Sequence, residues 1–398
     1  MLSLSMIVRD EAQRLEACLA SVRGFVDEMV VVDTGSVDNT VAIAEAQGAQ
    51  VHRIPWPGDF APARNQALTW LKGDWVLVLD ADEQLLPQAW QPLRALMAQP
   101  DVLVINLLRH EQGAVQSPYS NVSRLFRRHP AIRWSRAYHA MVDDSVAELL
   151  QHEPHWRIAD CPEPALIHDG YRPELLAQGH KAQRLREAME AELQERPNDA
   201  YACAKLGSLE VAEGNRSRGL ELLQLGLKHC PAAAHPERYE LLLHLAMAEA
   251  SDDPAAAVSR YREALAVPMA PRLNLAARLN LAALLLQQGN LPEAEELCRR
   301  ATAIAPEVGL GWYNLGLIRR RQGDIGGALE AYREARRLSP GHAETHQNLA
   351  VALLLGGDIE GSRNSFRQAI GLLQEQGRDS EASHLRQQAG ALVKLEAA

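Results

Sequence analysis

A repeat of 34 residues constrains the fold of this chain more than any other feature of its sequence. The segment WYNLGLIRRRQGDIGGALEAYREARRLSP (312–340) has counterparts 34 residues earlier and 34 residues later. Small residues recur where paired helices must approach closely, and prolines stop the second helices. One such unit cannot bury its apolar face alone, so the copies must stack into a helical solenoid. The repeated positions are Leu281, Ala282, Gly289, Ala294, Ala301 and Pro306, then Leu315, Gly316, Gly323, Ala328, Ala335 and Pro340, then Leu349, Ala350, Gly357, Phe366 and Ala369.

This spacing is typical of tetratricopeptide repeats. A further copy fits at Leu206, Gly207, Gly214 and Pro231, and a degenerate copy covers 239–268. We therefore expect about five repeats over 199–378, preceded by a helical linker over 173–198. Residues 379–398 are expected to form the capping helix that stacked repeats require.

Residues 1–172 follow a different pattern, in which short apolar runs alternate with helical segments. The runs predict strands at 2–8, 29–33, 50–54, 75–79 and 102–108. Helices are predicted at 11–23, from 36 or 38 to 47, and at 61–72. Strands that alternate with helices indicate a parallel α/β sheet. The chain is thus predicted to hold an α/β domain followed by an all-α solenoid.

Composition excludes several classes of protein. The net charge of -10 argues against a nucleic-acid partner, because phosphate backbones are bound by basic surfaces. Five scattered cysteines without a C-x-x-C pair favour a reducing compartment over a disulfide framework. No apolar run approaches the length of about 20 residues that spans a bilayer, and the N-terminus lacks a basic signal-peptide region. We expect a cytoplasmic protein, for which peripheral membrane contact stays open.

Carboxylates follow two of the predicted strands. The segment WVLVLDADE (75–83) places Asp80 and Asp82 directly after an apolar run, and Asp33 ends the strand 29–33. In open α/β sheets, ligands bind beyond the carboxyl ends of the strands. An Asp-x-Asp pair there can hold a divalent cation, which would neutralise a diphosphate, whereas the alternative is a solvated turn. Glycine-rich phosphate loops are missing from the sequence, so carboxylates, a metal and scattered side chains would have to hold a nucleotide.

Four segments carry a resemblance to a known family. SMIVRDEAQRLEACLASV, DEMVVVDTGSVDNTVAIAEAQGAQV, DFAPARNQAL and GDWVLVLDADE follow one another in the order and spacing of family 2 glycosyltransferases with the GT-A fold. The chain resembles most the bacterial branch that acts on lipopolysaccharide core and the branch fused to tetratricopeptide repeats. The resemblance covers most of residues 1–175. It implies a Rossmann-like, mostly parallel sheet, a nucleotide-diphosphate sugar as donor, usually UDP-linked, and a Mn²⁺ or Mg²⁺ ion.

The family's reaction is inverting glycosyl transfer. The Q-x-x-R-W signature of processive relatives is absent, so the resemblance implies that a single sugar is transferred per encounter. Repeat solenoids in relatives bind peptides or proteins, and the repeats here are expected to recruit the acceptor or a partner protein.

The resemblance assigns donor-binding roles to individual residues. Asp33 would bind the base, and Glu11 of the RDE segment would lie near the same pocket. Arg64 of the ARN segment would reach the nucleotide or its phosphates. Asp80 and Asp82 form the D-x-D motif. The alternatives are a helix-surface position for Arg64 and, for Glu11, an acid that complements a helix dipole.

A late histidine completes the implied metal site. Asp80 and Asp82 would hold the cation, with Asp82 the stronger candidate for a direct ligand. His168 of LIHDGY (166–171) matches a family element in which a histidine joins the metal. The alternative is a structural histidine that anchors the start of the helical tail.

The expected general base is missing. Relatives carry His-Glu where this chain has His139 followed by Ala140, in the segment RAYHAMVDDS. His139, Asp143 or Asp144 would have to substitute, and each is otherwise a surface-loop residue. In the preceding NVSRLFRRHPAIRW, Arg124 and Arg127 are expected to line the donor or acceptor site.

Two rival functions and one surface hypothesis stay open at this stage. Ala140 favours a binding scaffold whose transferase domain still binds nucleotide but has lost activity, whereas the intact Asp33, Asp80 and Asp82 oppose it. A nucleotidyltransferase would require a glycine-rich basic loop that SMIVRDEA does not provide. In the repeats, Asn280, Asn314 and Asn348 recur 34 residues apart and predict a polar ladder that binds a polypeptide. The alternative is that they sit in solvent or bind neighbouring helices.

Overall fold

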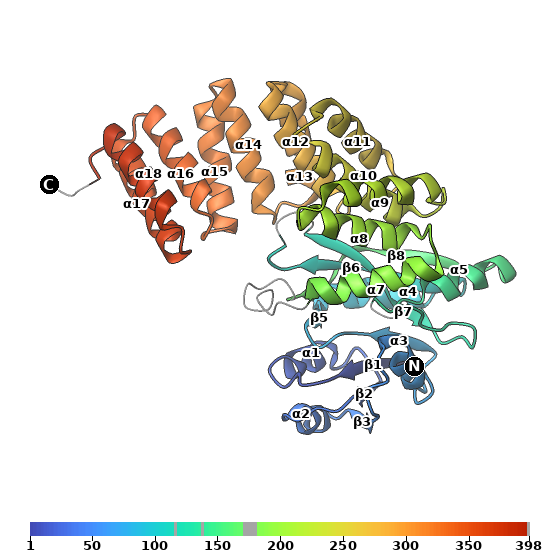
Figure 1. Cartoon of the computed structure of the whole chain (residues 1–398). Coiled ribbons are helices and arrows are strands. Elements are labelled where there is room, and N and C mark those ends of the chain that lie inside the picture. Colours follow the sequence, from blue (N-terminus) through green and yellow to red (C-terminus); the bar gives the residue numbers. More distant parts are fainter. Residues whose placement is uncertain (115–117, 137–138, 170–180, 396–398) are drawn as a thin grey trace. The chain divides into compact units, whose positions relative to one another are not determined.

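The computed structural model describes residues 1–114, 118–136, 139–169 and 181–395 (Figure 1). The chain forms two compact units, Met1–Leu209 and Glu210–Ala398. Gly170 and Tyr171 of the LIHDGY segment and the start of the predicted linker lie outside the described residues. In the part of the chain that is described, no helix has the length and apolar character needed to cross a bilayer.

The first half of the sheet agrees with the sequence prediction. Its strands are β1 (Leu2–Val8), β2 (Glu28–Asp33), β3 (Gln50–Arg53) and β4 (Trp75–Val78), all parallel, in the order β3-β2-β1-β4. The helices between them are α1 (Leu15–Val22), α2 (Thr40–Ala46) and α3 (Phe60–Leu68). Helix α1 starts later than predicted, and the preceding Glu11 backbone N–H donates to Thr40 Oγ1 at the start of α2.

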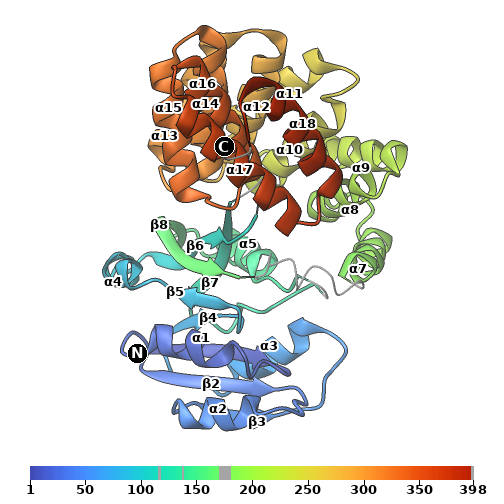
Figure 2. The ribbon, with the colours of Figure 1, turned by 90° about the vertical axis from the view of Figure 1, so that its left-hand side faces the viewer.

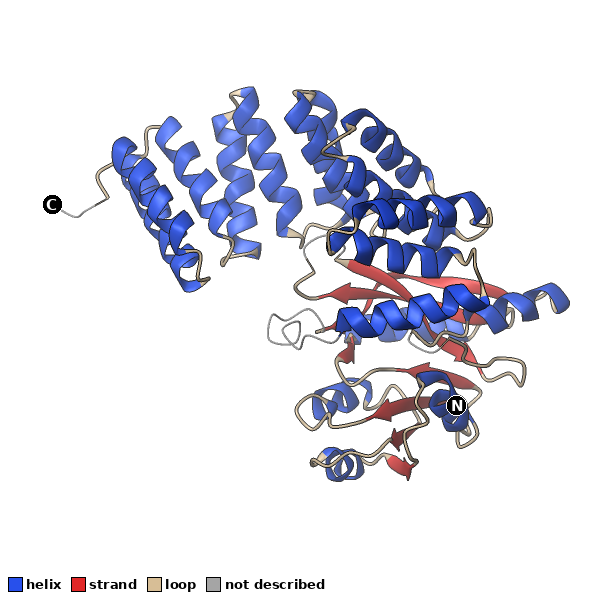
Figure 3. Ribbon diagram, viewed as in Figure 1, coloured by secondary structure: helices blue, strands red, loops and turns tan. Residues whose placement is uncertain are grey.

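The second half of the sheet was mostly not predicted. It contains β5 (Glu83–Leu85), β6 (Val102–Glu111), β7 (Tyr119–Arg127) and β8 (Arg157–His168), with the 3-10 helix η1 (Pro87–Ala89), α4 (Trp90–Met97) and α5 (Asp143–His152). The sheet continues from β4 as β7-β6-β8-β5, and β7 runs antiparallel to both of its neighbours. Figure 3 shows the strands in red and the helices in blue. Only β6 carries an apolar run long enough to recognise. β7 (YSNVSRLFR) alternates polar and apolar residues, and its polar positions conceal it.

Helices cover both faces of this sheet. One apolar cluster joins the sheet to α1, α2 and α4, and includes Leu19, Ala44 and Leu93. A second cluster joins the opposite face to α3 and α5, and includes Ala61 and Val146. Figure 2 shows the strands between these helices. The carboxyl ends of β1, β2 and β4 therefore meet at one edge of a buried sheet.

A β-bulge interrupts the pairing of β6 with β7. Ile105 pairs with Leu125, whereas Leu107 pairs with Val122, so Ser123 and Arg124 together face the single residue Asn106. Leu125 and Val122 both belong to the cluster beneath α1 and α4. The extra residue turns Ser123 and Arg124 toward the opposite face, where bulges commonly re-aim side chains beside functional sites.

The second compact unit, called the repeat unit, consists of helices that follow one another along the chain, as the 34-residue period predicts. Helix α7 (Lys181–Glu195) precedes α8 (Ala200–Ala212), which crosses the boundary between the units. The helices that follow are α9 (Arg216–His229), α10 (His235–Glu249), α11 (Pro254–Ala266), α12 (Leu275–Gln288), α13 (Leu291–Ile304), α14 (Gly309–Gln322), α15 (Ile325–Leu338), α16 (Ala343–Leu355), α17 (Ile359–Glu375) and α18 (Asp379–Leu392).

The expected ladder of exposed asparagines is not present. Asn314 is buried. Asn348 Nδ2 donates to Tyr313 Oη at 3.2 Å and to the Glu344 carbonyl at 2.9 Å. Asn348 is therefore bonded inside the solenoid and Asn314 is packed away from solvent, which agrees with the alternative that these asparagines contact neighbouring helices.

Candidate functional site

The loops after β1 and β2 are held together by side-chain hydrogen bonds. Asp33 is buried and accepts from the Ser36 N–H at 3.1 Å. Ser36 Oγ in turn accepts from the Asp10 N–H, and Asp10 Oδ1 accepts from the Val37 N–H. These bonds fix the Asp33 carboxylate at the mouth of the strand, next to the loop that carries Glu11.

Asp80, at the end of β4, lies between two arginines. Its Oδ1 accepts from Arg64 on α3 at 2.6 Å, and its Oδ2 accepts from Arg124 on β7 at 2.8 Å. Desolvation opposes ionisation of Asp80, but the guanidinium groups of Arg124 and Arg64 outweigh it and hold the pKa well below its usual value. Arg64 is buried and stacks over Trp134 with 4.7 Å between its Cζ and the ring centroid. Arg64 is therefore not a helix-surface residue.

A second chain of charges starts at Glu83, which is fully buried. Glu83 accepts from the Asp80 N–H at 2.9 Å and from Arg109 Nη1 at 2.6 Å. Arg109 Nε donates to Glu111 Oε1 at 2.8 Å, and Glu111 Oε2 lies 2.5 Å from His168 Nδ1. β6 and β8 are parallel with Glu111 opposite His168, which explains why the two side chains meet.

His168 and Asp82 lie side by side, as the predicted metal site requires. His168 Nε2 is 3.3 Å from Asp82 Oδ2, on the side of the ring opposite Glu111. Burial lowers the pKa of His168, but its hydrogen bonds with Asp82 and Glu111 outweigh burial and raise the pKa to about 9. Desolvation raises the pKa of Glu111, and its bonds with His168 and Arg109 outweigh this and lower the pKa to about 2.

This donor set fits a divalent cation. A metal-binding histidine usually donates a hydrogen bond from the N–H of its second ring nitrogen, often to a carboxylate. Glu111 is the carboxylate in that position here. Within the described ranges, no three histidine, cysteine or acidic side chains converge as a complete ligand set. Mg²⁺ and similar ions need only one or two carboxylates when a substrate phosphate supplies further oxygens. Asp82 and His168 would thus hold the ion together with a diphosphate.

Glu11 belongs to the same cluster. Arg14 bridges Glu11 to the candidate metal ligand Asp82. Its Nε lies 3.5 Å from Glu11 Oε2, and its Nη1 lies 3.5 Å from Asp82 Oδ2. Desolvation raises the pKa of Glu11; Arg14 lowers it, and the nearby Asp82 and Asp80 raise it. The structure therefore brings Glu11, Asp80, Asp82, Arg64 and His168 together.

Among the three candidate bases, Asp143 is the one whose contact leads to this cluster. It begins α5, and its Oδ1 lies 2.8 Å from Ser123 Oγ, next to Arg124 in the bulge. The residue keeps solvent-accessible surface. Protein atoms around its carboxylate desolvate it and raise its pKa, which suits a group that must take up a proton.

The other two candidates have structural partners. Asp144 pairs with Arg136 at 3.2 Å; desolvation raises its pKa, but the hydrogen bond from Arg136 outweighs this and lowers it. His139 is exposed, and its Nδ1 lies 2.6 Å from the hydroxyl of Tyr201. Ala140 packs against the apolar cluster of α3 and α5, so the position where relatives carry the acid lies beside apolar side chains.

The structure corrects the predicted role of Arg127 and adds three charged residues to the cluster. Arg127 donates to the carbonyls of Val102 and Gln99 and stacks over Trp75, so it holds the end of α4 and does not line the site. The sequence analysis assigned no role to Glu83, Arg109 or Glu111. A signal was present, because β6 ends in charged residues after an apolar run, and charged residues also follow the apolar run that contains β4.

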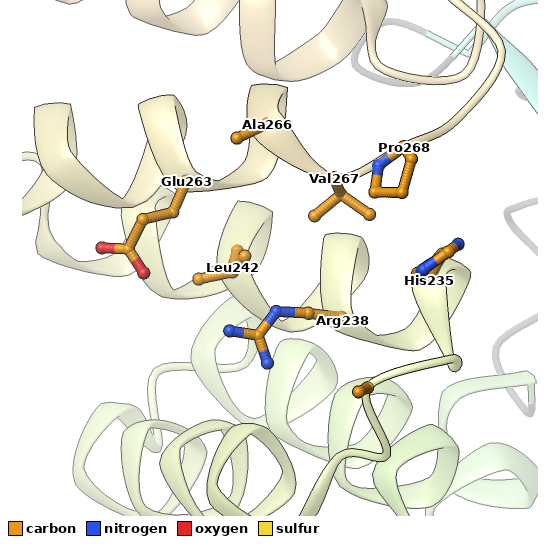
Figure 4. A pocket seen from close by; sticks show the side chains of 8 residues that line it. His235, Arg238, Leu242, Glu263, Ala266, Val267 and Pro268 are labelled. Atoms are coloured by element: carbon orange, nitrogen blue, oxygen red, sulfur yellow. The ribbon is translucent and has the colours of Figure 1, made fainter.

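A cavity of about 300 Å³ lies in the repeat unit (Figure 4). Its walls come from α10, the end of α11 and the adjacent turns, and include Arg238, Leu242 and Glu263. None of its lining residues belongs to the charged cluster of the first unit.

Comparisons with known proteins agree with this division of the chain. A model of glycosyl transferase family 2 matches residues 3–157, and a tetratricopeptide repeat model matches residues 248–308 and 313–379. A TPR repeat-containing protein of Synechococcus elongatus is 47% identical over 308 residues, which cover 76% of this chain and 75% of that protein. An uncharacterized glycosyltransferase of Rickettsia bellii is 32% identical over 136 residues, covering 32% of this chain and 46% of that protein. The crystal structure of PilW, a type IV pilus biogenesis factor, covers 52% of this chain and 90% of its own, with 18% identity and a TM-score of 0.45.

Replacing Glu83 by alanine should destabilise the first unit. The change leaves Arg109 beside the cluster without its closest carboxylate and the Asp80 N–H without its acceptor. Removing one partner of a buried ion pair costs about 3–5 kcal/mol. Urea unfolding should show this loss. Glu148→Ala is the matched control, because its pair with Arg133 is exposed and such pairs contribute at most about 1 kcal/mol. Equal losses in the two variants would contradict the role of Glu83.

Proposed function

The chain belongs to the family 2 glycosyltransferases that carry C-terminal tetratricopeptide repeats, and we propose that its first unit transfers one sugar from a UDP-linked donor to an acceptor hydroxyl with inversion. The observation that carries the proposal is the alignment of Asp82, His168 and Glu111, with 3.3 Å between Asp82 Oδ2 and His168 Nε2. The UDP nucleotide rests on the family resemblance.

A divalent cation bound by Asp82 and His168 would stabilise the charge of the leaving diphosphate. Glu111 contacts His168 Nδ1 and fixes the ring, which would leave Nε2 to bind the ion. Asp80 keeps Arg64 and Arg124 aimed at the same region. Both Asp80 oxygens are already held by ion pairs of 2.6 and 2.8 Å, so we assign the direct contact to Asp82.

The remaining donor contacts follow from the loops. Asp33, fixed at the end of β2, would accept a hydrogen bond from the base, and Glu11 lies beside the same edge of the sheet. Arg64 and Arg124 would pair with diphosphate oxygens when the donor enters. Both guanidinium groups are already oriented by Asp80, so little reorganisation accompanies binding.

Transfer then needs a base on the acceptor side, and we assign Asp143 to it. The acceptor oxygen forms a bond with the anomeric carbon while the bond from that carbon to the diphosphate oxygen breaks. The leaving nucleoside diphosphate takes the electron pair, and the hydroxyl proton passes to the Asp143 carboxylate. Asp144 is less suited to this task, because Arg136 and Arg196 both hold it in the ionised form.

The repeat unit would recruit a polypeptide. Tetratricopeptide solenoids offer extended surfaces for such partners. We place this contact outside the asparagine positions, because Asn314 is buried and Asn348 is bonded inside the solenoid.

Replacing Asp82 by alanine should abolish the Mn²⁺-dependent stabilisation of the protein by UDP. The variant retains His168 but loses the negatively charged ligand. Thermal unfolding of the full chain would be followed with UDP, with and without Mn²⁺, and with a chelator. Asp101→Ala is the control, since Asp101 also pairs with an arginine but at an exposed site. An undiminished UDP effect in Asp82→Ala, or in the parent protein with chelator, would reject the metal site.

Replacing Asp143 by asparagine should leave UDP binding intact and slow transfer. A general base contributes a factor of about 10²–10⁴, so UDP release from the donor that the parent uses should fall at least about 100-fold. Asp144→Asn provides the contrast: it weakens the pairing with Arg136 and should lower thermal stability more than the rate per folded molecule. A parent-like rate in Asp143→Asn would show that another group takes the proton.

A further inference from the structure

A row of polar side chains crosses three adjacent strands next to the proposed base. It consists of Asp160 on β8, Asn106 on β6, and Asn121 and Ser123 on β7, and is called the amide row below. Asp160 Oδ1 accepts from Asn106 Nδ2 at 2.9 Å and from Asn121 Nδ2 at 3.2 Å. Ser123 Oγ lies 3.0 Å from Asn106 Oδ1. The strands β7, β6 and β8 are neighbours in the sheet, so the row is continuous.

The amide row leads directly to Asp143. Ser123 Oγ is within hydrogen-bond distance of both Asn106 Oδ1 and Asp143 Oδ1. One hydroxyl hydrogen can be donated to only one of these oxygens at a time. A proton on Asp143 would satisfy both contacts, because Asp143 would then donate to Ser123. The bulge that turns Arg124 toward Asp80 turns Ser123 toward Asp143, so one backbone feature positions both sides of the reaction.

The row also has unused hydrogen-bonding capacity. Asp160 is exposed, and Asn106, Asn121 and Ser123 are half-buried. Asp160 Oδ2 and Asn121 Oδ1 have no hydrogen-bond partner among the described residues. Each asparagine has a second N–H as well. Acceptors and donors thus alternate over a surface that water can reach.

We infer that the amide row is the acceptor subsite, and that it binds an oligosaccharide whose terminal hydroxyl is presented to Asp143. This inference rests on the proposed function and adds the class of acceptor. A sugar hydroxyl both donates and accepts a hydrogen bond, which matches alternating amide and carboxylate groups. The row contains no cationic side chain, so it is poorly suited to a phosphate-bearing acceptor. Strands lie about 4.8 Å apart, so a row across three of them spans about 10 Å, longer than a single sugar ring.

The test measures saccharide binding apart from donor turnover. The labelled full-length protein would be applied to an oligosaccharide array in the presence of UDP and Mn²⁺, beside the double variant Asn121→Ala/Asp160→Ala. Gln66→Ala is the control, because it removes an exposed amide from α3 of the same unit. Thermal unfolding and UDP titration would show that each variant is folded and binds the nucleotide. If the double variant unfolds, the single variant Asn121→Ala takes its place.

The parent protein and the control should bind oligosaccharides, and the double variant should bind them at least tenfold more weakly with unchanged UDP affinity. Equal saccharide binding in the double variant would overturn the inference. So would a parent protein that binds UDP but no saccharide, for example one that binds peptides instead. A parent protein that fails to bind UDP would contradict the proposed function, while its saccharide binding would still decide the acceptor subsite.

Discussion

The ion pairs of Asp80 with Arg64 and Arg124 are the interaction on which the rest of the first unit depends. They join α3 and β7 to the end of β4, with Arg64 lying 16 residues before Asp80 in the chain and Arg124 lying 44 residues after it. β7 reaches Asp80 only because it inserts antiparallel beside β4 and carries the bulge at Ser123 and Arg124. A buried charge that lost these partners would carry a large desolvation penalty. That penalty favours the arrangement in which α3, β4 and β7 keep the three side chains in contact.

The same pairs explain why three carboxylates follow one apolar strand. Like charges at this spacing would repel one another in isolation. Here each acid has a cationic neighbour: Arg64 and Arg124 for Asp80, Arg14 and His168 for Asp82, and Arg109 for Glu83. Glu11 and Glu111 pair with Arg14 and Arg109 in the same network, so the acids and the cations are equal in number before a donor arrives. A diphosphate that enters with a divalent cation can exchange partners within this network and keep that balance.

Sequence reasoning named the acids that follow apolar strands, and the family resemblance added Arg64, Arg124 and His168, but neither indicated which side chains pair with one another. Asp33, Asp80 and Asp82 stand at strand ends, where periodicity alone reveals them. Glu111 and His168 meet because β6 and β8 pair in parallel, and that register is not visible in either segment.

Tertiary contacts that the sequence does not reveal also decide between the three candidate bases and determine where the repeat asparagines lie. His139, Asp143 and Asp144 look alike in a loop sequence, and only the partners Tyr201, Ser123 and Arg136 distinguish them. The bulge has no sequence signature, because it is a property of two strands together. In the solenoid, the 34-residue period located the helices, but whether Asn314 and Asn348 face a ligand or a neighbouring helix was decided by packing.

The central claim is that the carboxyl ends of β4 and β8 hold a divalent cation between Asp82 and His168. The most direct measurement is anomalous diffraction from crystals of the full chain grown with UDP and Mn²⁺. The account predicts a manganese peak in contact with Asp82 Oδ2 and His168 Nε2 and with the diphosphate, while Glu111 stays bonded to His168 Nδ1. A UDP-bound crystal with no manganese peak, or with the peak on other residues, would contradict it.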